Sequence, residues 1–321
     1  IPNYIFSLGG NISVKAGGRV NFRNVNLDAD MTITRSKPFT PQSQIGEDIL
    51  GIVNGEKIAY SVSINKDGNI IAVGSVEYSP GGRVTTYEHK IPTATEWNTA
   101  NIVMKGTDTS QVTGKLYWTR RGSIIAPSGT DKHALCRLNN SGNILVVCDW
   151  VLNSRQGRVF AYEWRTENGF TDWHPLGTNH PVHISNVNNA SYTKICLNGD
   201  GTIFGAISSG QQRGKVFQYI NDTWTQIGND IQETSIDNFN PSNVAMNDAG
   251  DIIAIGARQA KFGGNTVGGV CVYKNTDNNW AKIGTIQGVS SGGNFGIVVS
   301  LNAAGDILAV TAEKTDADTN H

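Results

Sequence analysis

Three histidines that lie close together in the sequence could ligate a metal ion. His174, His180 and His183 belong to the segment His-Pro-Leu-Gly-Thr-Asn-His-Pro-Val-His, and imidazole is a common ligand of transition metals. The segment lacks the i, i+4 spacing that places two histidines on one helix face. We therefore interpret it as a loop with solvent-exposed histidines, and we predict neither a metal site nor a cofactor.

Acidic residues could instead carry acid–base chemistry. Several of them fall in predicted hairpin turns, where Asp is favoured for backbone reasons: Asp67, Asp200, Asp248 and Asp251. A glycan-cleaving enzyme needs two carboxylates at a defined separation, which a sequence does not show. The chain contains no Gly-x-Ser-x-Gly elbow, P-loop or His-Glu-x-x-His motif. We predict no catalytic residues and a protein that is not an enzyme.

Aromatic residues outside the repeated pattern described below are the best candidates to contact a ligand or partner. They are Trp97, Trp150, Trp164, Tyr4 and Phe6. An aromatic ring offers apolar area with a defined orientation, and sugar rings stack on such faces. Glycans are therefore an alternative class of ligand beside protein partners.

The elements that position these residues come from a pattern of three motifs. The first is an apolar residue followed by Asn-x-x-Gly, at Asn65–Gly68, Asn139–Gly142, Asn198–Gly201, Asn247–Gly250 and Asn302–Gly305. The second is Gly-x-Val-x-x-Tyr, at Gly82–Tyr87, Gly157–Tyr162, Gly214–Tyr219 and Gly268–Tyr273. The third is Trp-x-x-x-Gly, at Trp118–Gly122, Trp173–Gly177, Trp224–Gly228 and Trp280–Gly284. Four complete units thus follow one another.

Each motif predicts a turn or a strand. Asn-x-x-Gly between apolar runs is typical of a tight hairpin, and the β-branched run after each glycine indicates a buried strand. Gly-x-Val-x-x-Tyr predicts the third strand, and the Trp motif the outer one. Repeated four-stranded units indicate an all-β fold, a β-propeller. The recurring tryptophans are then expected to pack between neighbouring blades.

The fifth unit is divided between the two ends of the chain. Leu301 starts it, and the sequence stops at His321; at the front, Gly18–Phe22 resembles the second motif, and Gln42–Gly46 the third, with Gln42 in place of Trp. A shared blade would close the ring and remove unpaired sheet edges. We predict five four-stranded blades closed in this way. The alternative is a longer protein with more blades beyond His321.

These motifs also predict the domain organisation. Residues 1–16 form a strand or hairpin extension, and residues 17–321 form a single propeller. The shared blade combines residues 17–49 and 294–321, and residues 88–117 are an insertion projecting from one blade. The extension would cover a blade of its own molecule or add a strand to a neighbour.

Cysteines and sequons add little chemistry. Cys136 and Cys148 flank one predicted hairpin turn, so a disulfide between them is one possibility. The favoured interpretation is that these two cysteines, like Cys196 and Cys271, are small buried thiols that pack as hydrophobic residues. Asn11 and Asn221 are the sequons best placed for glycosylation.

Composition excludes some partners. The 321 residues carry a net charge of −1, which gives no electrostatic reason to expect nucleic acid. No apolar run is long enough to span a bilayer, so we predict no membrane insertion. Abundant Gly, Asn, Ser and Thr with sparse Lys and Glu are typical of extracellular and virion-surface β proteins.

The combined motifs resemble the FG-GAP-type β-propeller repeats of marine bacterial surface proteins and large algal viruses, from about Gly17 to His321. Phe-Gly survives only at Phe295-Gly296 and Gly-Ala only at Gly256-Ala257, where Arg258 replaces the proline of the family. The calcium loops of the integrin members are not matched, so bound calcium is not carried over. The resemblance implies the fold much more than a function.

Together these features favour a non-enzymatic structural, interaction or adhesion module on a virion, fibre or cell surface. Its partners would be other proteins or further copies of itself. A carbohydrate-binding lectin is the alternative, and a glycan-cleaving enzyme is the third possibility.

Overall fold

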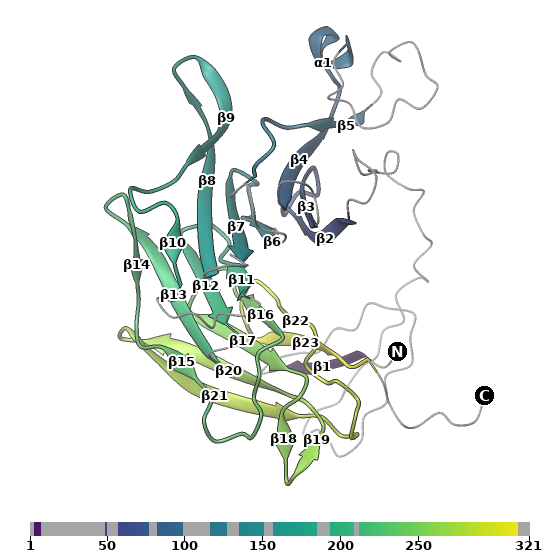
Figure 1. Ribbon diagram of the computed structural model, residues 1–321, viewed down its shortest axis with the longest axis vertical. Helices are drawn as coiled ribbons and strands as arrows, with labels where there is room; N and C mark the ends of the chain where they lie inside the picture. Colours follow the sequence, from purple (N-terminus) through teal and green to yellow (C-terminus); the bar gives the residue numbers. More distant parts are fainter. Residues whose placement is uncertain are drawn as a thin grey trace, which may run out of the picture.

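The computed structural model describes residues 3–7, 49, 57–76, 82–98, 116–126, 135–150, 157–184, 193–208 and 212–313. They form several four-stranded antiparallel sheets, so the chain is all-β with a propeller-like arrangement. Figure 1 shows the sheets following one another around the molecule in chain order. The short helix α1 (Ala94–Asn98) is the one helix in this part of the chain.

Four sheets contain the four strands expected of each unit. Sheet 1 consists of β2 (Lys57–Ile64), β3 (Ile70–Val76), β4 (Arg83–Lys90) and β5 (Tyr117–Arg120). Sheet 2 consists of β6 (Leu135–Leu138), β7 (Ile144–Trp150), β8 (Gly157–Glu167) and β9 (Phe170–Pro175), with β10 (Val182–His183) also on β8. Sheet 3 consists of β11 (Thr193–Leu197), β12 (Ile203–Ser208), β13 (Arg213–Ile220) and β14 (Thr223–Gln226), with β15 (Ile231–Gln232) also on β13.

Sheet 4 consists of β16 (Asn243–Met246), β17 (Ile252–Ala257), β20 (Gly269–Thr276) and β21 (Asn279–Gln287). The hairpin of β18 (Lys261–Phe262) and β19 (Asn265–Thr266) interrupts its β17–β20 connection. Sheet 5 contains β22 (Val299–Leu301), β23 (Ile307–Thr311) and β1 (Asn3–Ser7). The predicted strand for each motif is therefore confirmed in the four complete units.

The Asn-x-x-Gly motifs form the turns between the first two strands of each sheet. In sheet 2 the side-chain oxygen of Asn139 accepts hydrogen bonds from the backbone N–H groups of Asn143 (3.0 Å) and Ile144 (2.9 Å). Gly142 has a φ of 72°, which glycine adopts at little cost. The buried asparagine thus satisfies backbone donors that would otherwise lack partners.

These turns are also joined to one another by backbone hydrogen bonds. In the first four motifs, the backbone N–H of the residue after the asparagine donates to the carbonyl of its counterpart in the next sheet: Lys66 to Asn140 (3.0 Å), Asn140 to Gly199 (2.9 Å), Gly199 to Asp248 (3.0 Å) and Asp248 to Ala303 (3.0 Å). One chain of hydrogen bonds therefore connects all five sheets at the turn end of their inner strands.

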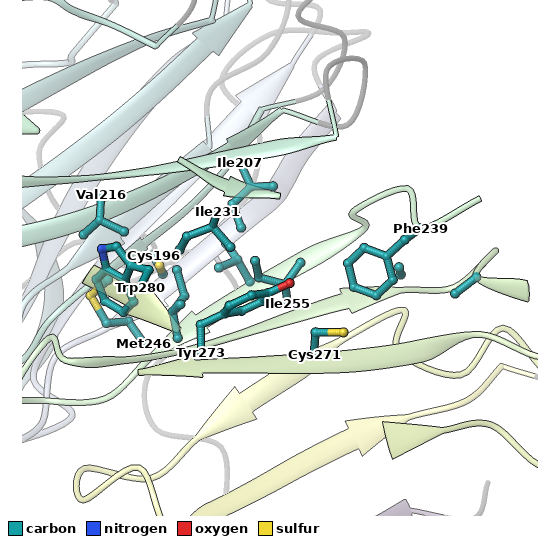
Figure 2. Packing of buried hydrophobic residues seen from close by; sticks show 14 residues of the cluster. Cys196, Ile207, Val216, Ile231, Phe239, Met246, Ile255, Cys271, Tyr273 and Trp280 are labelled. Carbon is teal, nitrogen blue, oxygen red and sulfur yellow. The ribbon is translucent and has the colours of Figure 1, made fainter. Parts of the chain in front are cut away.

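The hydrophobic core lies between the sheets, and the recurring tryptophans anchor it. The Trp224 indole N–H donates to the carbonyl of Leu176 in sheet 2 (3.0 Å), and that of Trp280 to the carbonyl of Ile227 in sheet 3 (3.2 Å). Figure 2 shows Trp280 among buried side chains from sheets 3 and 4. The predicted packing between sheets is confirmed for Trp173, Trp224 and Trp280, whereas Trp118 packs against Val73 and Tyr87 of its own sheet and against Ile49.

Strands from the first and last described segments of the chain meet in sheet 5. Strand β1 pairs antiparallel with β23, and Asn3 lies opposite Thr311 while Ser7 lies opposite Ile307. The strand that joins the C-terminal hairpin is therefore residues 3–7, which were expected in a separate extension. The expected strands at Gly18–Phe22 and Gln42–Gly46 lie outside the described residues.

The cysteines are small buried hydrophobes. All four are free, and Cys136 lies opposite Val147 while Cys148 lies opposite Leu135. Consecutive positions of a strand point to opposite faces of the sheet, so Cys136 and Cys148 belong to different core clusters. The disulfide that the sequence left open does not form.

Candidate functional site

A pocket between sheets 1 and 2 contains Trp164, one of the predicted contact residues. The pocket has a volume of about 400 Å³, a size that is ordinary for small-molecule sites. We call it the Trp164 pocket; it is lined by Glu88, Lys90, Glu96, Arg120, Arg121, Gly122, Ser123, Trp164, Thr171 and Asp172. Figure 1 shows α1 and the β8–β9 hairpin, which both contribute to it, at the same upper end of the molecule.

An arginine stacked on the tryptophan forms the inner part of the pocket. The guanidinium carbon of Arg121 lies 4.4 Å from the ring centroid of Trp164 and 5.4 Å from that of Trp173. Nη1 of Arg121 donates to the carbonyl of Gly142 (2.7 Å). Arg121 is only 9% exposed, and its buried Nε–H has no hydrogen-bond partner among the described residues. Burial lowers the pKa of this guanidinium, against the attraction of Glu88.

Both stacked residues depart from the repeat. Arg121 precedes the motif glycine, where the other units have Leu176, Ile227 and Ile283. Trp164 lies two residues after the motif tyrosine, where the other units have His89, Asn221 and Asn275. At this junction, therefore, a cationic side chain replaces an aliphatic one. It contacts a tryptophan that replaces a smaller polar residue.

The same junction has a modified tryptophan anchor. The indole N–H of Trp173 donates to the hydroxyl of Thr86 (2.8 Å), which in turn donates to the carbonyl of Arg121 (2.6 Å). At the next two junctions the indole donates directly to the carbonyl at the position of Arg121. The inserted hydroxyl gives both the Trp173 indole N–H and the Arg121 carbonyl a partner and makes this junction more polar than the next two.

The carboxylates of the pocket are fixed by hydrogen bonds. Asp172 accepts from the backbone N–H of Ser123 (2.8 Å), from the Ser123 hydroxyl and from the backbone N–H of Trp173 (2.8 Å). Burial works to raise the pKa of Asp172, but these hydrogen bonds outweigh it and lower the pKa below its ordinary value. The carboxylate is therefore ionised at neutral pH and acts as an acceptor.

Helix α1 supplies the second fixed carboxylate. Glu96 accepts from the backbone N–H of Thr93 (2.9 Å) in a capping box and pairs with the ammonium of Lys90 (2.8 Å). Burial opposes ionisation, yet the contacts with Lys90 and Thr93 lower the pKa of Glu96. Lys90 also lies 3.6 Å from Glu88. In contrast, the side chain of half-buried Arg120 has no ion pair or hydrogen bond with any residue that the structure describes.

The other predicted contact residues lie elsewhere. Trp97 is 6% exposed and packs edge-on against Tyr117, with ring centroids 5.2 Å apart, so the two rings form a small core of their own. Trp150 is the last residue of β7, opposite Gly157. Tyr4 and Phe6 lie in β1, opposite Val310 and Leu308. The insertion that carries Trp97 runs between the end of β4 at Lys90 and the start of β5 at Tyr117.

The two sequons differ in what the structure shows. Asn11 lies outside the described residues, whereas Asn221 is exposed in the turn between β13 and β14, with a φ of 49°.

The three histidines are separated by their contacts. Nδ1 of His174 lies 3.3 Å from a carboxylate oxygen of Glu167, while the His180 ring packs edge-on against Phe160 and Tyr162. His183 is exposed on β10. Within the described ranges, no group of three or more His, Cys, Asp or Glu side chains could hold a metal ion.

A second polar cluster lies in the core between sheets 3 and 4. One oxygen of Glu233 lies 2.8 Å from Lys282 Nζ, 3.3 Å from the Tyr273 hydroxyl and 3.5 Å from the Cys271 sulfur, and the other accepts from the backbone N–H of Ser235 (2.7 Å). Burial raises the pKa of Cys271 to about 11, so the thiol stays protonated and unreactive. This cluster holds the sheets together and contains no activated nucleophile.

Comparisons with known proteins do not identify the chain. No family model and no curated protein matches it, so the FG-GAP-type resemblance stays a prediction. Among solved structures, a functionally unknown protein from Desulfotomaculum acetoxidans is 9% identical, with a TM-score of 0.45, 73% of this chain covered and only 57% of that one. Hydrazine synthase of Kuenenia stuttgartiensis is 12% identical, with a TM-score of 0.47 and coverages of 80% and 71%. At these values the likenesses establish neither fold nor function.

The described helix does not resemble a membrane span. It is too short to cross a bilayer, and no other helix occurs in the described ranges.

Proposed function

We propose that the protein is a non-enzymatic β-propeller that serves as an interaction or adhesion module on a virion, fibre or cell surface. The observation that supports this most is the chemistry of the Trp164 pocket. Glu96 and Asp172 are both held in their ionised form, so neither is poised to donate a proton near pH 7. Fixed acceptors, cations and an aromatic wall are suited to binding a polar ligand.

We infer a ring of five four-stranded blades, closed by a shared blade. Ile231, which ends the third Trp motif segment, belongs to the same core cluster as Tyr273 and Trp280 of the following sheet. Ile49 occupies the equivalent sequence position in Gln-Ile-Gly-Glu-Asp-Ile, and it packs against the cluster of Val73, Tyr87 and Trp118 in sheet 1. The end of the divided unit thus contacts sheet 1 as the third unit contacts sheet 4.

The mass of the natively purified protein by light scattering, followed by negative-stain microscopy, tests the role in assembly. A large regular particle, or a stable complex with a captured surface protein, is the expected result. A monomer of 34.5 kDa that captures no partner would contradict the proposal.

Carbohydrate binding is the second candidate function. It is favoured by half-buried Trp164 on the wall of a polar pocket. The residues that make this pocket polar occur at one junction of the repeat, so a lectin of this kind would use one site, not a set repeated between all blades. A glycan array separates this candidate from a purely protein-binding module.

A further inference from the structure

We propose that the Trp164 pocket binds an acidic sugar, a uronic-acid residue of a glycan whose carboxylate is held by Arg120 and Arg121. This inference rests on the proposed function, because it names the ligand class of that same binding site. A site for such a sugar requires a cation for the carboxylate, polar partners for the ring hydroxyls and an apolar wall for the ring carbons.

Two arginines, Arg120 and Arg121, supply the cations, and neither has a described carboxylate partner in an ion pair. Arg121 lines the pocket with a buried Nε–H that has no partner in the described part of the chain, and its guanidinium is fixed in place by the Trp164 ring. This Nε–H is closed off from the pocket, so what Arg121 offers a bound carboxylate is its positive charge at the pocket lining. Arg120, the preceding residue, also lines the pocket and has no described counter-ion. Arginine binds planar carboxylates through paired N–H donors, and such charge-assisted hydrogen bonds are among the strongest.

The rest of the lining fits a sugar ring better than a simple anion. Trp164 supplies apolar surface and Glu88 supplies acceptor oxygens. The hydroxyls of Ser123 and Thr171 already contact Asp172 and Thr166, and their oxygen atoms keep further acceptor capacity. A carboxylate acceptor pairs well with sugar hydroxyls, which are hydrogen-bond donors. The volume of about 400 Å³ leaves room for a small ligand.

The negative groups of the same pocket argue against a more highly charged ligand. Glu96 and Asp172 are ionised, as their lowered pKa values indicate, and like charges in a partly buried site repel. A phosphate dianion or a sulfated chain would meet this repulsion at several points. A uronic acid carries one negative charge and several hydroxyls, so it matches a pocket that has cations on one part of its wall and acceptors on another.

Binding is best measured by isothermal titration calorimetry of the full chain with a galacturonic-acid trisaccharide, and with the matched methyl-esterified trisaccharide as the neutral probe. Replacing half-buried Arg120 by Gln is the main variant, because it removes a charge whose side chain has no described ion pair or hydrogen bond and leaves the backbone pairing with Tyr87 in place. Arg213→Gln is the control, since Arg213 is an exposed arginine of sheet 3, 3.7 Å from Asp230. Circular dichroism of each variant verifies folding.

We expect the acidic trisaccharide to bind at least about tenfold more tightly than its ester. Arg120→Gln should remove that preference, and Arg213→Gln should retain it. Equal binding of the two trisaccharides, an unaffected Arg120→Gln variant, or no binding at all would overturn the inference. Particle mass and partner capture are measured separately, so the two proposals can fail independently. If the protein assembles but does not bind uronic acids, this inference is wrong and the proposed function stands. If it is a monomer that captures no partner but binds uronic acids, the proposed function is wrong and this inference stands.

Discussion

Gly228 in sheet 3 lies so close to Trp280 in sheet 4 that a Cβ atom on the glycine would be 2.6 Å from the indole Cδ1. The same relationship recurs one sheet earlier, where a Cβ on Gly177 would be 3.0 Å from Cδ1 of Trp224. At these two junctions the glycine that ends the Trp-x-x-x-Gly motif therefore makes room for the tryptophan of the following unit, whereas a Cβ on Gly122 would instead meet Asp172 and Trp164. At Gly284, the counterpart in sheet 4, no described atom lies within 4 Å of such a Cβ.

Gly228→Ala should destabilise the protein, because the new methyl group meets Trp280 and because Gly228 has a φ of 71°. We expect a loss of about 1–3 kcal/mol in the free energy of unfolding, measured by urea denaturation. Gly284→Ala is the matched control and should change stability by less than about 0.5 kcal/mol. Equal effects at the two positions would contradict this role for the motif glycine.

Trp280→Phe should also weaken the junction between sheets 3 and 4. The substitution removes the hydrogen bond to the carbonyl of Ile227 and leaves this acceptor and a small cavity behind. We expect a cost of about 2 kcal/mol in the same denaturation experiment. Phe170→Ala, at a side chain that is 77% exposed, serves as the control and should be near neutral. A Trp280→Phe variant as stable as the wild type would show that the indole is not an anchor.

Much of the fold could be predicted from the sequence, because its signals are local and repeated. Asn139 forms the predicted turn through hydrogen bonds to residues only four and five positions away. The strand pairing at the N-terminus was not predictable in the same way. Asn3–Ser7 and Ile307–Thr311 are far apart in the chain, and both Tyr4–Leu8 and Gly18–Phe22 have strand-like patterns.

The site was predicted only in part, because it is assembled across two sheets and an insertion. Trp164 was singled out as an aromatic residue outside the repeat, but so was Trp97, whose burial depends on its packing with Tyr117. Arg121 was missed, although a signal was present: it stands where the other units have Leu or Ile. The approach of Glu96 to Lys90 depends on how α1 folds back, which no local pattern indicates.

The carboxylate of Glu233 should make the stability of the protein pH-dependent. Burial works to raise its pKa, but the contacts with Lys282 and Ser235 outweigh it and lower the pKa from 4.5 to about 2. A lowered folded-state pKa stabilises the protein above the unfolded-state value, so this contribution is present above pH 4.5 and is lost as pH falls towards 2. Its full size is about 3 kcal/mol.

Urea denaturation between pH 7 and pH 2.5 should therefore show a steeper loss of stability for the wild type than for Glu233→Gln. Glu167→Gln, at a half-exposed side chain, is the control and should follow the wild type. Parallel curves for the wild type and Glu233→Gln would contradict the assignment.

Arg121→Leu should separate binding from stability. The substitution restores the aliphatic residue found at this position in the other units, and replacing a buried charge by a well-packed apolar group is often neutral or stabilising. We expect thermal stability to be retained, while binding of the galacturonic-acid trisaccharide falls by about tenfold or more. Binding equal to that of the wild type would show that Arg121 does not hold the ligand. A much lower unfolding temperature would show that the fold requires this arginine.

The most direct test of the Trp164 pocket as the binding site is a nuclear magnetic resonance titration that follows the indole N–H signals of the tryptophans. With added galacturonic-acid trisaccharide, the signals of Trp164 and Trp173 should shift in a saturable way, because Arg121 stacks on both rings. Those of Trp224 and Trp280, at the junctions without this arginine, should stay unchanged. Shifts at Trp224 or Trp280 without any at Trp164, or no saturable shift at any indole, would contradict the claim that the protein binds its ligand between sheets 1 and 2.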